Sequence, residues 1–121
     1  MTVMQEVRRG DVPGWFEDLA KREGVSLADL VDGVKSGTIV ALRNAGRSLG
    51  RSMAVGRGLR TKINANIGTS PDHDNLAEEL EKLRVCIEYE ADTVMDLSTG
   101  TDIRGTRRRM IEHSSIALGT V

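Results

Sequence analysis

Polar and apolar residues alternate along residues 59–67, near the middle of the chain, and this alternation predicts a β-strand. Its polar face carries Lys62, Asn64 and Asn66. Buried parallel strands are normally apolar on both faces, so two amides on one face are unusual there. The amides need hydrogen-bond partners, which either neighbouring strands or a bound ligand could supply.

The pattern after this strand changes to helical periodicity and then returns to strands. Helices are expected from Asn75, a capping residue, to about Tyr89 and over 102–113, with strands at 93–97 and 116–121. This order predicts consecutive βα units with parallel strands. The carboxyl edge of such a sheet, where α/β folds bind ligands, would collect several polar residues. They are Asn64, Asn66, Thr69, Ser70, Asp96, Ser98 and Thr99.

The first part of the chain predicts a small helical module. One helix is expected over 13–22, closed by Gly24, and a second between the N-cap Ser26 and Gly37. Residues 38–42 favour a short strand. Residues 44–58 contain four glycines and are expected to be irregular or weakly helical. The predicted domains are therefore 1–58, a helical module with one short strand, and 59–121, the βα units.

Composition indicates an ordinary soluble domain, with 39% hydrophobic and 29% charged residues among 121. The single cysteine, Cys86, excludes an intrachain disulfide framework, and no apolar run reaches membrane-spanning length. We therefore expect a cytoplasmic protein that does not bind membranes.

Charge is distributed unevenly: residues 34–70 contain seven cations and no acid. Arg43, Arg47 and Arg51 recur every four residues and would form one stripe on a helix. A solvated face is favoured over nucleic-acid binding, because no aromatic residues are interleaved with the arginines. We expect no nucleic-acid partner.

Other candidates for chemistry carry weaker signals. Asp92 and Asp96 lie at opposite ends of a predicted strand, which argues against an acid/base pair. His73 and His113 show no spacing typical of a metal site. The turns 68–70 and 98–100 could offer backbone N–H groups to a phosphate, although ordinary turn chemistry explains them equally well.

Two long motifs resemble a known family. Residues 62–70 (KINANIGTS) and 91–100 (ADTVMDLSTG), together with 78–82 (EELEK) between them, are similar to phosphomethylpyrimidine synthases, the radical S-adenosylmethionine enzymes of thiamine biosynthesis. That family converts 5-aminoimidazole ribotide to hydroxymethylpyrimidine phosphate. The resemblance departs at Glu90 and Thr101, where the family usually has glycine, and in the segment 41–45.

The resemblance implies the fold class α/β: a partial TIM-type barrel of about three parallel βα units, preceded by a small helical N-terminal module. It implies Asn66 and Met95 as ribotide-binding residues, and no catalytic or metal-binding residue in this chain. The full-length family implies a [4Fe-4S] cluster, S-adenosylmethionine and zinc. Their cysteine and histidine ligands would lie after Val121, so we expect this chain to hold none of these cofactors.

Two functional hypotheses follow. In the first, the chain is an N-terminal fragment of the synthase that carries part of the ribotide site and is inactive alone. In the second, it is a non-catalytic paralogue or interaction module that keeps only the scaffold. A three-stranded sheet would also leave one face and one edge uncovered. We therefore expect either self-association or the N-terminal helices folding across the sheet.

Overall fold

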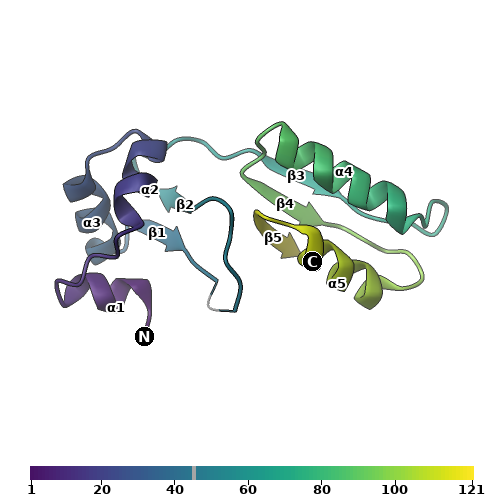
Figure 1. The fold of residues 1–121 in the computed structure, drawn as a ribbon, viewed down its shortest axis with the longest axis horizontal. Coiled ribbons are helices and arrows are strands. Elements are labelled where there is room, and N and C mark those ends of the chain that lie inside the picture. Colours follow the sequence, from purple (N-terminus) through teal and green to yellow (C-terminus); the bar gives the residue numbers. More distant parts are fainter. Residues whose placement is uncertain (45) are drawn as a thin grey trace. The chain divides into compact units, whose positions relative to one another are not determined.

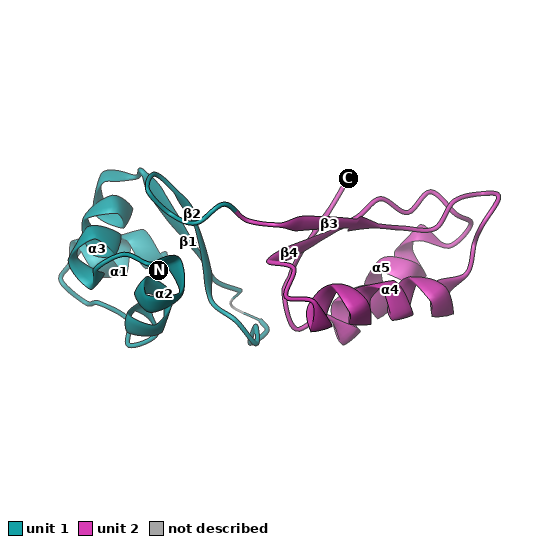
Figure 2. Cartoon of the chain, turned by 90° about the horizontal axis from the view of Figure 1, so that it is seen from above, with its two compact units in different colours: residues 1–61 teal, residues 62–121 magenta. Residues whose placement is uncertain are grey.

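The computed structural model describes residues 1–44 and 46–121 and divides into two compact units, 1–61 and 62–121 (Figures 1 and 2). The described residues form an α/β structure with five helices and two separate sheets, one antiparallel and one parallel. No helix in these two ranges is both long and apolar enough to cross a bilayer.

Unit 1 consists of three helices and a two-stranded sheet. The helices are α1 (Val3–Arg8), α2 (Phe16–Glu23) and α3 (Leu27–Ser36), and the strands are β1 (Ile39–Leu42) and β2 (Met53–Gly56). The strands pair antiparallel, and all five elements contribute buried residues to one core. That core contains Val7, Phe16, Leu19, Ala20, Leu30, Val31, Val34, Ile39 and Ala54.

Local capping signals position α2 and α3 as predicted. Gly24 and Gly37 end these helices in the left-handed conformation, with φ of 71° and 79°. The Ser26 side chain accepts a hydrogen bond from the Asp29 backbone N–H at the start of α3. These residues satisfy backbone groups that a helix end leaves unpaired, which explains why the ends could be predicted.

The prediction for 44–58 is wrong at β2, because Met53–Gly56 is a strand paired with β1. The two strands are separated by the connection 43–52, so the four residues of β2 carry no local signal for this pairing. The described residues of 43–52 are not helical, so Arg43, Arg47 and Arg51 do not form a stripe on a helix. Sequence reasoning missed α1 as well, although Thr2 and Gln5 form a capping box at its start.

Unit 2 contains three parallel strands connected through two helices. The elements are β3 (Asn64–Ile67), α4 (Leu76–Glu88), β4 (Thr93–Asp96), α5 (Ile103–His113) and β5 (Ala117–Thr120). The strand order is β3-β4-β5, so each strand lies beside its successor in the chain. This confirms the predicted parallel βα units. The structure does not show a TIM-type barrel, because the described residues form an open sheet of three strands.

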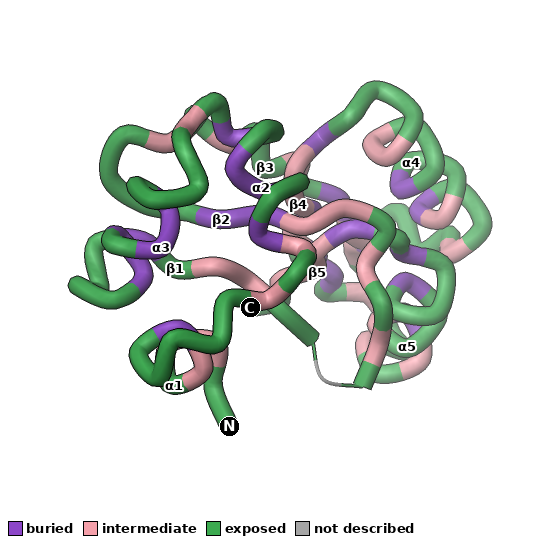
Figure 3. The backbone as a smooth tube through the Cα atoms, turned by 60° about the vertical axis from the view of Figure 1, so that its left-hand side comes forward, coloured by how far each residue is buried: buried purple, intermediate pink, exposed green. Residues whose placement is uncertain are grey.

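Helices α4 and α5 lie on the same side of this sheet (Figure 2). Both helices contain buried residues (Figure 3), and Leu83 and Met110 are 1% and 0% exposed. These residues belong to one core with that side of the sheet. The sheet supplies Ala65, Ile67, Val94 and Leu118 to this core. We call this the helix face. The alternate residues form what we call the open face, which the helices of unit 2 leave uncovered: Asn64, Asn66, Thr93, Met95, Ala117 and Gly119.

Candidate functional site

The two predicted binding residues, Asn66 and Met95, lie next to each other on the open face. They are register partners on β3 and β4, and Met95 is in turn the partner of Gly119 on β5. Asn66 is exposed and Met95 is half-buried. The parallel strands therefore place an amide, a thioether and a glycine in one row near the carboxyl edge, where α/β sheets bind ligands.

Side-chain hydrogen bonds link the amides to the neighbouring strand. The Thr93 hydroxyl on β4 donates to Oδ1 of Asn64 at 2.6 Å, and Nδ2 of Asn64 donates to Oδ1 of Asn66 at 3.3 Å. Thr93 and Asn64 are themselves register partners. Asn64 thus has protein partners at both its oxygen and its nitrogen. Among residues 1–44 and 46–121, Nδ2 of Asn66 has no protein acceptor and stays available on the open face.

Gly119 determines where the Met95 side chain lies. A Cβ atom on Gly119 would be 3.2 Å from both Sδ and Cε of Met95. The thioether therefore extends over β5 into the space that the missing side chain leaves. A polar group on β3 consequently lies beside an apolar surface over β4 and β5. This arrangement suits a ligand that has both a hydrogen-bonding and an apolar part.

The turns after β3 and β4 are joined by their own hydrogen bonds. The backbone N–H of Thr69 donates to the Ser98 hydroxyl at 3.2 Å, that of Thr99 to the Thr69 carbonyl at 2.8 Å, and that of Gly100 to the Thr69 hydroxyl at 3.3 Å. From the sequence alone, backbone N–H groups of these turns are possible phosphate ligands. The three named here donate to acceptors within the protein. Ordinary turn chemistry accounts for them.

Gly68 lets these two turns approach closely. Its φ is +152°, and a Cβ there would lie 2.6 Å from the carbonyl carbon of Leu97 and the backbone nitrogen of Ser98. A side chain would therefore force the two turns apart. The two hydrogen-bonded turns lie at the carboxyl end of the row of Asn66 and Met95.

Asp96 belongs to the helix face and does not reach this site. Its carboxylate is fully buried, accepts from the Ser98 backbone N–H at 2.9 Å and lies 3.3 Å from Nε of Arg107 on α5. A buried charge requires such partners. Asp96 therefore fixes the turn and α5 rather than contacting a ligand on the open face.

Asp74 connects the loop after β3 to the turn after β4. Its Oδ2 accepts from the Thr101 backbone N–H at 2.7 Å and also from the Thr101 hydroxyl. These bonds, from the hydroxyl first and then the backbone, lower the pKa of the Asp74 carboxyl. The negative charge is thus favoured by the folded loop.

Sequence reasoning missed Thr93, Gly119 and Asp74 as residues around the site. Thr93 lies 29 positions after Asn64, the same separation that links Asn66 to Met95, so the motif spacing could have indicated it. Glycine inside a strand often marks a close approach, which is the signal at Gly119. The partner of Asp74 across two loops has no comparable local signal.

The described residues do not form a metal or cluster site. No group of three or more His, Cys, Asp or Glu side chains comes together in 1–44 and 46–121. Cys86 is half-buried and packs against the core of unit 2, His73 bonds Glu78, and His113 bonds the Arg109 carbonyl. A [4Fe-4S] cluster requires three or four thiolates, so these residues fit neither that cluster nor zinc.

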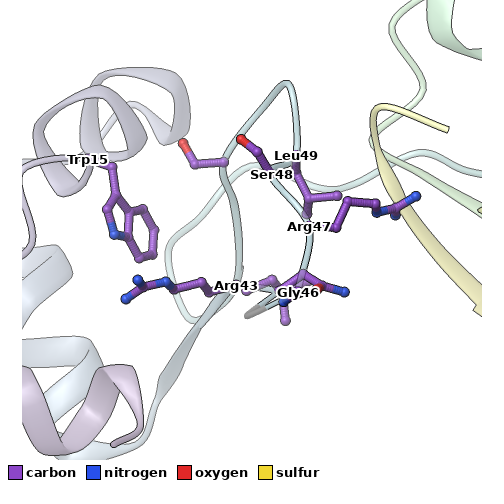
Figure 4. Close-up of a pocket in the computed structure, with 9 residues that line it drawn as sticks. Trp15, Arg43, Gly46, Arg47, Ser48 and Leu49 are labelled. Atoms are coloured by element: carbon purple, nitrogen blue, oxygen red, sulfur yellow. Dashed lines mark hydrogen bonds between the residues drawn. The ribbon is translucent and has the colours of Figure 1, made fainter. Parts of the chain in front are cut away.

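Unit 1 contains a separate cavity of about 520 Å³ between Trp15 and the connection after β1 (Figure 4). The Arg43 side chain extends toward the Trp15 side of the cavity, and the Arg47 side chain extends away from it (Figure 4). Arg43 also forms an ion pair with Glu6, with an N–O distance of 3.6 Å. The predicted binding residues, Asn66 and Met95, do not line it. We therefore treat the open face of unit 2 as the candidate site.

The structure shows an α/β protein whose parallel strands carry polar and apolar residues on a face that the helices of unit 2 leave uncovered. The chain belongs to the radical SAM ThiC family, whose model it matches over residues 2–121.

Three of its relatives are phosphomethylpyrimidine synthases. It is 45% identical over 122 residues to the phosphomethylpyrimidine synthase of Thermus thermophilus, 43% over 121 residues to that of Thermodesulfovibrio yellowstonii, and 46% over 121 residues to that of Desulforamulus reducens. Each alignment covers 100% of this chain and 28% of the relative. The chain thus spans little more than a quarter of the length of these relatives.

Proposed function

We propose that this chain supplies the first βα units of a phosphomethylpyrimidine synthase, with Asn66 and Met95 forming part of the binding wall for 5-aminoimidazole ribotide. The family match and the shared name of the relatives support this proposal. In it, β3, β4 and β5 are the first strands of a TIM-type barrel, and the open face of unit 2 becomes part of the barrel lining.

The observation that carries the proposal is the row formed by Asn66 and Met95. A ribotide has a polar sugar phosphate and a flat heterocycle, and the row offers an amide donor beside a thioether. The amide suits an oxygen of the sugar phosphate, and the polarisable sulfur suits the face of the heterocycle. The two side chains lie on adjacent paired strands, so one ligand can contact both.

The chain's share of the reaction is substrate binding. In the full-length family, the [4Fe-4S] cluster and S-adenosylmethionine would supply the radical chemistry, and the residues that hold them and zinc would belong to other parts of that enzyme. The residues described here hold the substrate and orient it. We therefore propose that the chain alone does not turn over ribotide.

A non-catalytic interaction module is the second candidate. It is favoured by the open face itself and by the β5 edge, whose outer side has no strand partner within unit 2. An uncovered sheet face and an unpaired strand edge can both bind a second copy of the chain or another protein. Both candidates predict no turnover, so ligand binding distinguishes them.

Calorimetric titration of the chain with 5-aminoimidazole ribotide tests the proposal. We expect saturable binding with a Kd on the order of millimolar, because few contacts must overcome the cost of association. Binding should disappear in Asn66→Ala and persist in Asn44→Ala, a matched change at an exposed asparagine in unit 1. Absence of binding by the unaltered chain at millimolar ligand would retire the proposal in favour of the interaction module.

A further inference from the structure

The hydrogen bonds that join Thr93, Asn64 and Asn66 have a direction. The distance of 2.6 Å between Oγ1 of Thr93 and Oδ1 of Asn64 is within the O–H···O range and below the usual N–H···O range. The oxygen of Asn64 therefore faces the threonine. Its Nδ2 consequently faces Asn66, whose Oδ1 accepts at 3.3 Å.

This direction leaves Asn66 with one polar group for a ligand. Its oxygen is engaged by Asn64, and in the part of the chain that the structure describes its Nδ2 donates to no protein group. An amide nitrogen only donates, so the outward group of Asn66 is a donor.

We propose that Thr93 and Asn64 are positioning residues that hold Asn66 as a hydrogen-bond donor, so that the ligand atom on Asn66 is an oxygen acceptor of a ribose or phosphate group. The inference deepens the proposed function and rests on it for the identity of the ligand. The orientation of the amides can be tested without any ligand.

Reversing the direction carries a cost at both bonds. With the Asn64 amide turned over, its nitrogen would lie 2.6 Å from the Thr93 oxygen, too close for an ordinary N–H···O bond. Its oxygen would meet the Asn66 oxygen unless that amide also turned. Thr93 is well suited to set the direction, because a β-branched side chain has a restricted χ1 and its strand position is fixed by pairing with Asn64.

The isosteric change Asn64→Asp tests the orientation directly. The new carboxylate cannot donate, so the Asn66 amide should turn and donate to it. In the ¹⁵N-labelled chain without ligand, NMR should show both Asn66 side-chain amide protons exchanging with water at exposed rates. In Asn64→Asp, we expect one of them to exchange several times more slowly. Protection of an Asn66 proton in the unaltered chain, or unchanged exchange in the variant, overturns the inference.

The role of Thr93 is tested by a pair of variants. Thr93→Val removes the hydroxyl at nearly constant shape and should release the Asn64 amide, so that its protected proton exchanges faster. Thr93→Ser keeps the hydroxyl and should restore protection. Equal exchange in the valine and serine variants contradicts a positioning role for the hydroxyl.

Ligand titration completes the test. Thr93→Val and Asn64→Asp should weaken ribotide binding about five- to tenfold, the effect of one hydrogen bond, with rescue in Thr93→Ser and no change in Thr38→Val in unit 1. Titration with the riboside, which lacks the phosphate, distinguishes the acceptor. If Asn66 binds a ribose oxygen, the two variants should also weaken riboside binding; if it binds a phosphate oxygen, they should not.

Undiminished binding in both variants contradicts the inference. Failure of the unaltered chain to bind overturns the proposed function, while the exchange results still decide the orientation.

Discussion

The two faces of the parallel sheet in unit 2 belong to the same strands but differ in burial and in polarity. On the helix face, Ile67 and Val94 are 7% and 0% exposed and pack against α4 and α5. On the open face, one residue earlier or later along the same strands, lie an exposed amide and a half-buried thioether. A shift of one residue in register would exchange the two sets. The comparison teaches that alternation separates the residues that stabilise this unit from those that are available to a ligand.

The largest effect should come from breaking the helix face. Leu83→Ala removes a side chain that is 1% exposed in the core of unit 2, and we expect a loss of about 2–5 kcal/mol in the free energy of unfolding. Urea denaturation followed by circular dichroism measures it. Val85→Ala on the same helix is the control, since Val85 is 40% exposed, and its loss should stay below about 1 kcal/mol. Equal losses of unfolding free energy in the two variants would contradict burial of the Leu83 side of α4.

A smaller change in stability, with a clear change in binding, is expected on the open face. In Gly119→Ala the new methyl group would lie 3.2 Å from Sδ and Cε of Met95, whose flexible end can shift away. The free energy of unfolding should change by less than about 1 kcal/mol. Ribotide affinity should fall a few-fold, because the thioether leaves its place over β5. Calorimetry and urea denaturation on the same sample measure both, and unchanged affinity would remove Gly119 from the site.

The same open face leads us to expect self-association of this chain. Sedimentation velocity should show a concentration-dependent increase in the average mass, and excess ribotide should reduce it if ligand and second copy compete for the face. A monomer at all concentrations would contradict this expectation and leave the face free for other partners.

The smallest effect should come from the contact between Asp74 in the loop after β3 and Thr101 in the turn after β4. Hydrogen bonds from Thr101 lower the pKa of Asp74 below its ordinary value of 3.8. Its contribution to stability is therefore present above that value and is lost as the pH falls through the lowered pKa. The urea midpoint should fall slightly less in Asp74→Asn than in the unaltered chain when the pH is lowered from about 5 to about 2. An identical fall in both would show that the contact adds nothing.

Much of this structure could be predicted because its signals are local. Gly24 and Gly37 end helices, Ser26 and Asn75 begin them, and alternation in 59–67 assigns Asn64 and Asn66 to one face. The strand β3 itself is shorter than predicted, since it begins at Asn64. Alternation identifies faces reliably but does not tell where pairing starts.

The features that could not be predicted depend on contacts between distant residues. Strand β2 exists through its pairing with β1, and the Asp74 contact joins two loops. The spacing of Glu78 and Lys82 along α4 would favour an ion pair between them. Lys82 instead contacts the buried Glu79, whose other carboxylate oxygen accepts from the Gly68 backbone N–H. Glu78 contacts His73. Spacing along one helix cannot show such competition, because the competing partner comes from the neighbouring loop.

The ε-methyl NMR signals of Met95 and Met110 test the central claim most directly, because these methionines lie on opposite faces of unit 2. With ¹³C-labelled methionine and increasing ribotide, we predict a saturable shift of the Met95 methyl and a constant signal for Met110, which is fully buried on the helix face. A shift of Met110 without Met95, or no shift of Met95 at saturating ligand, would contradict the assignment of the open face as the ligand site.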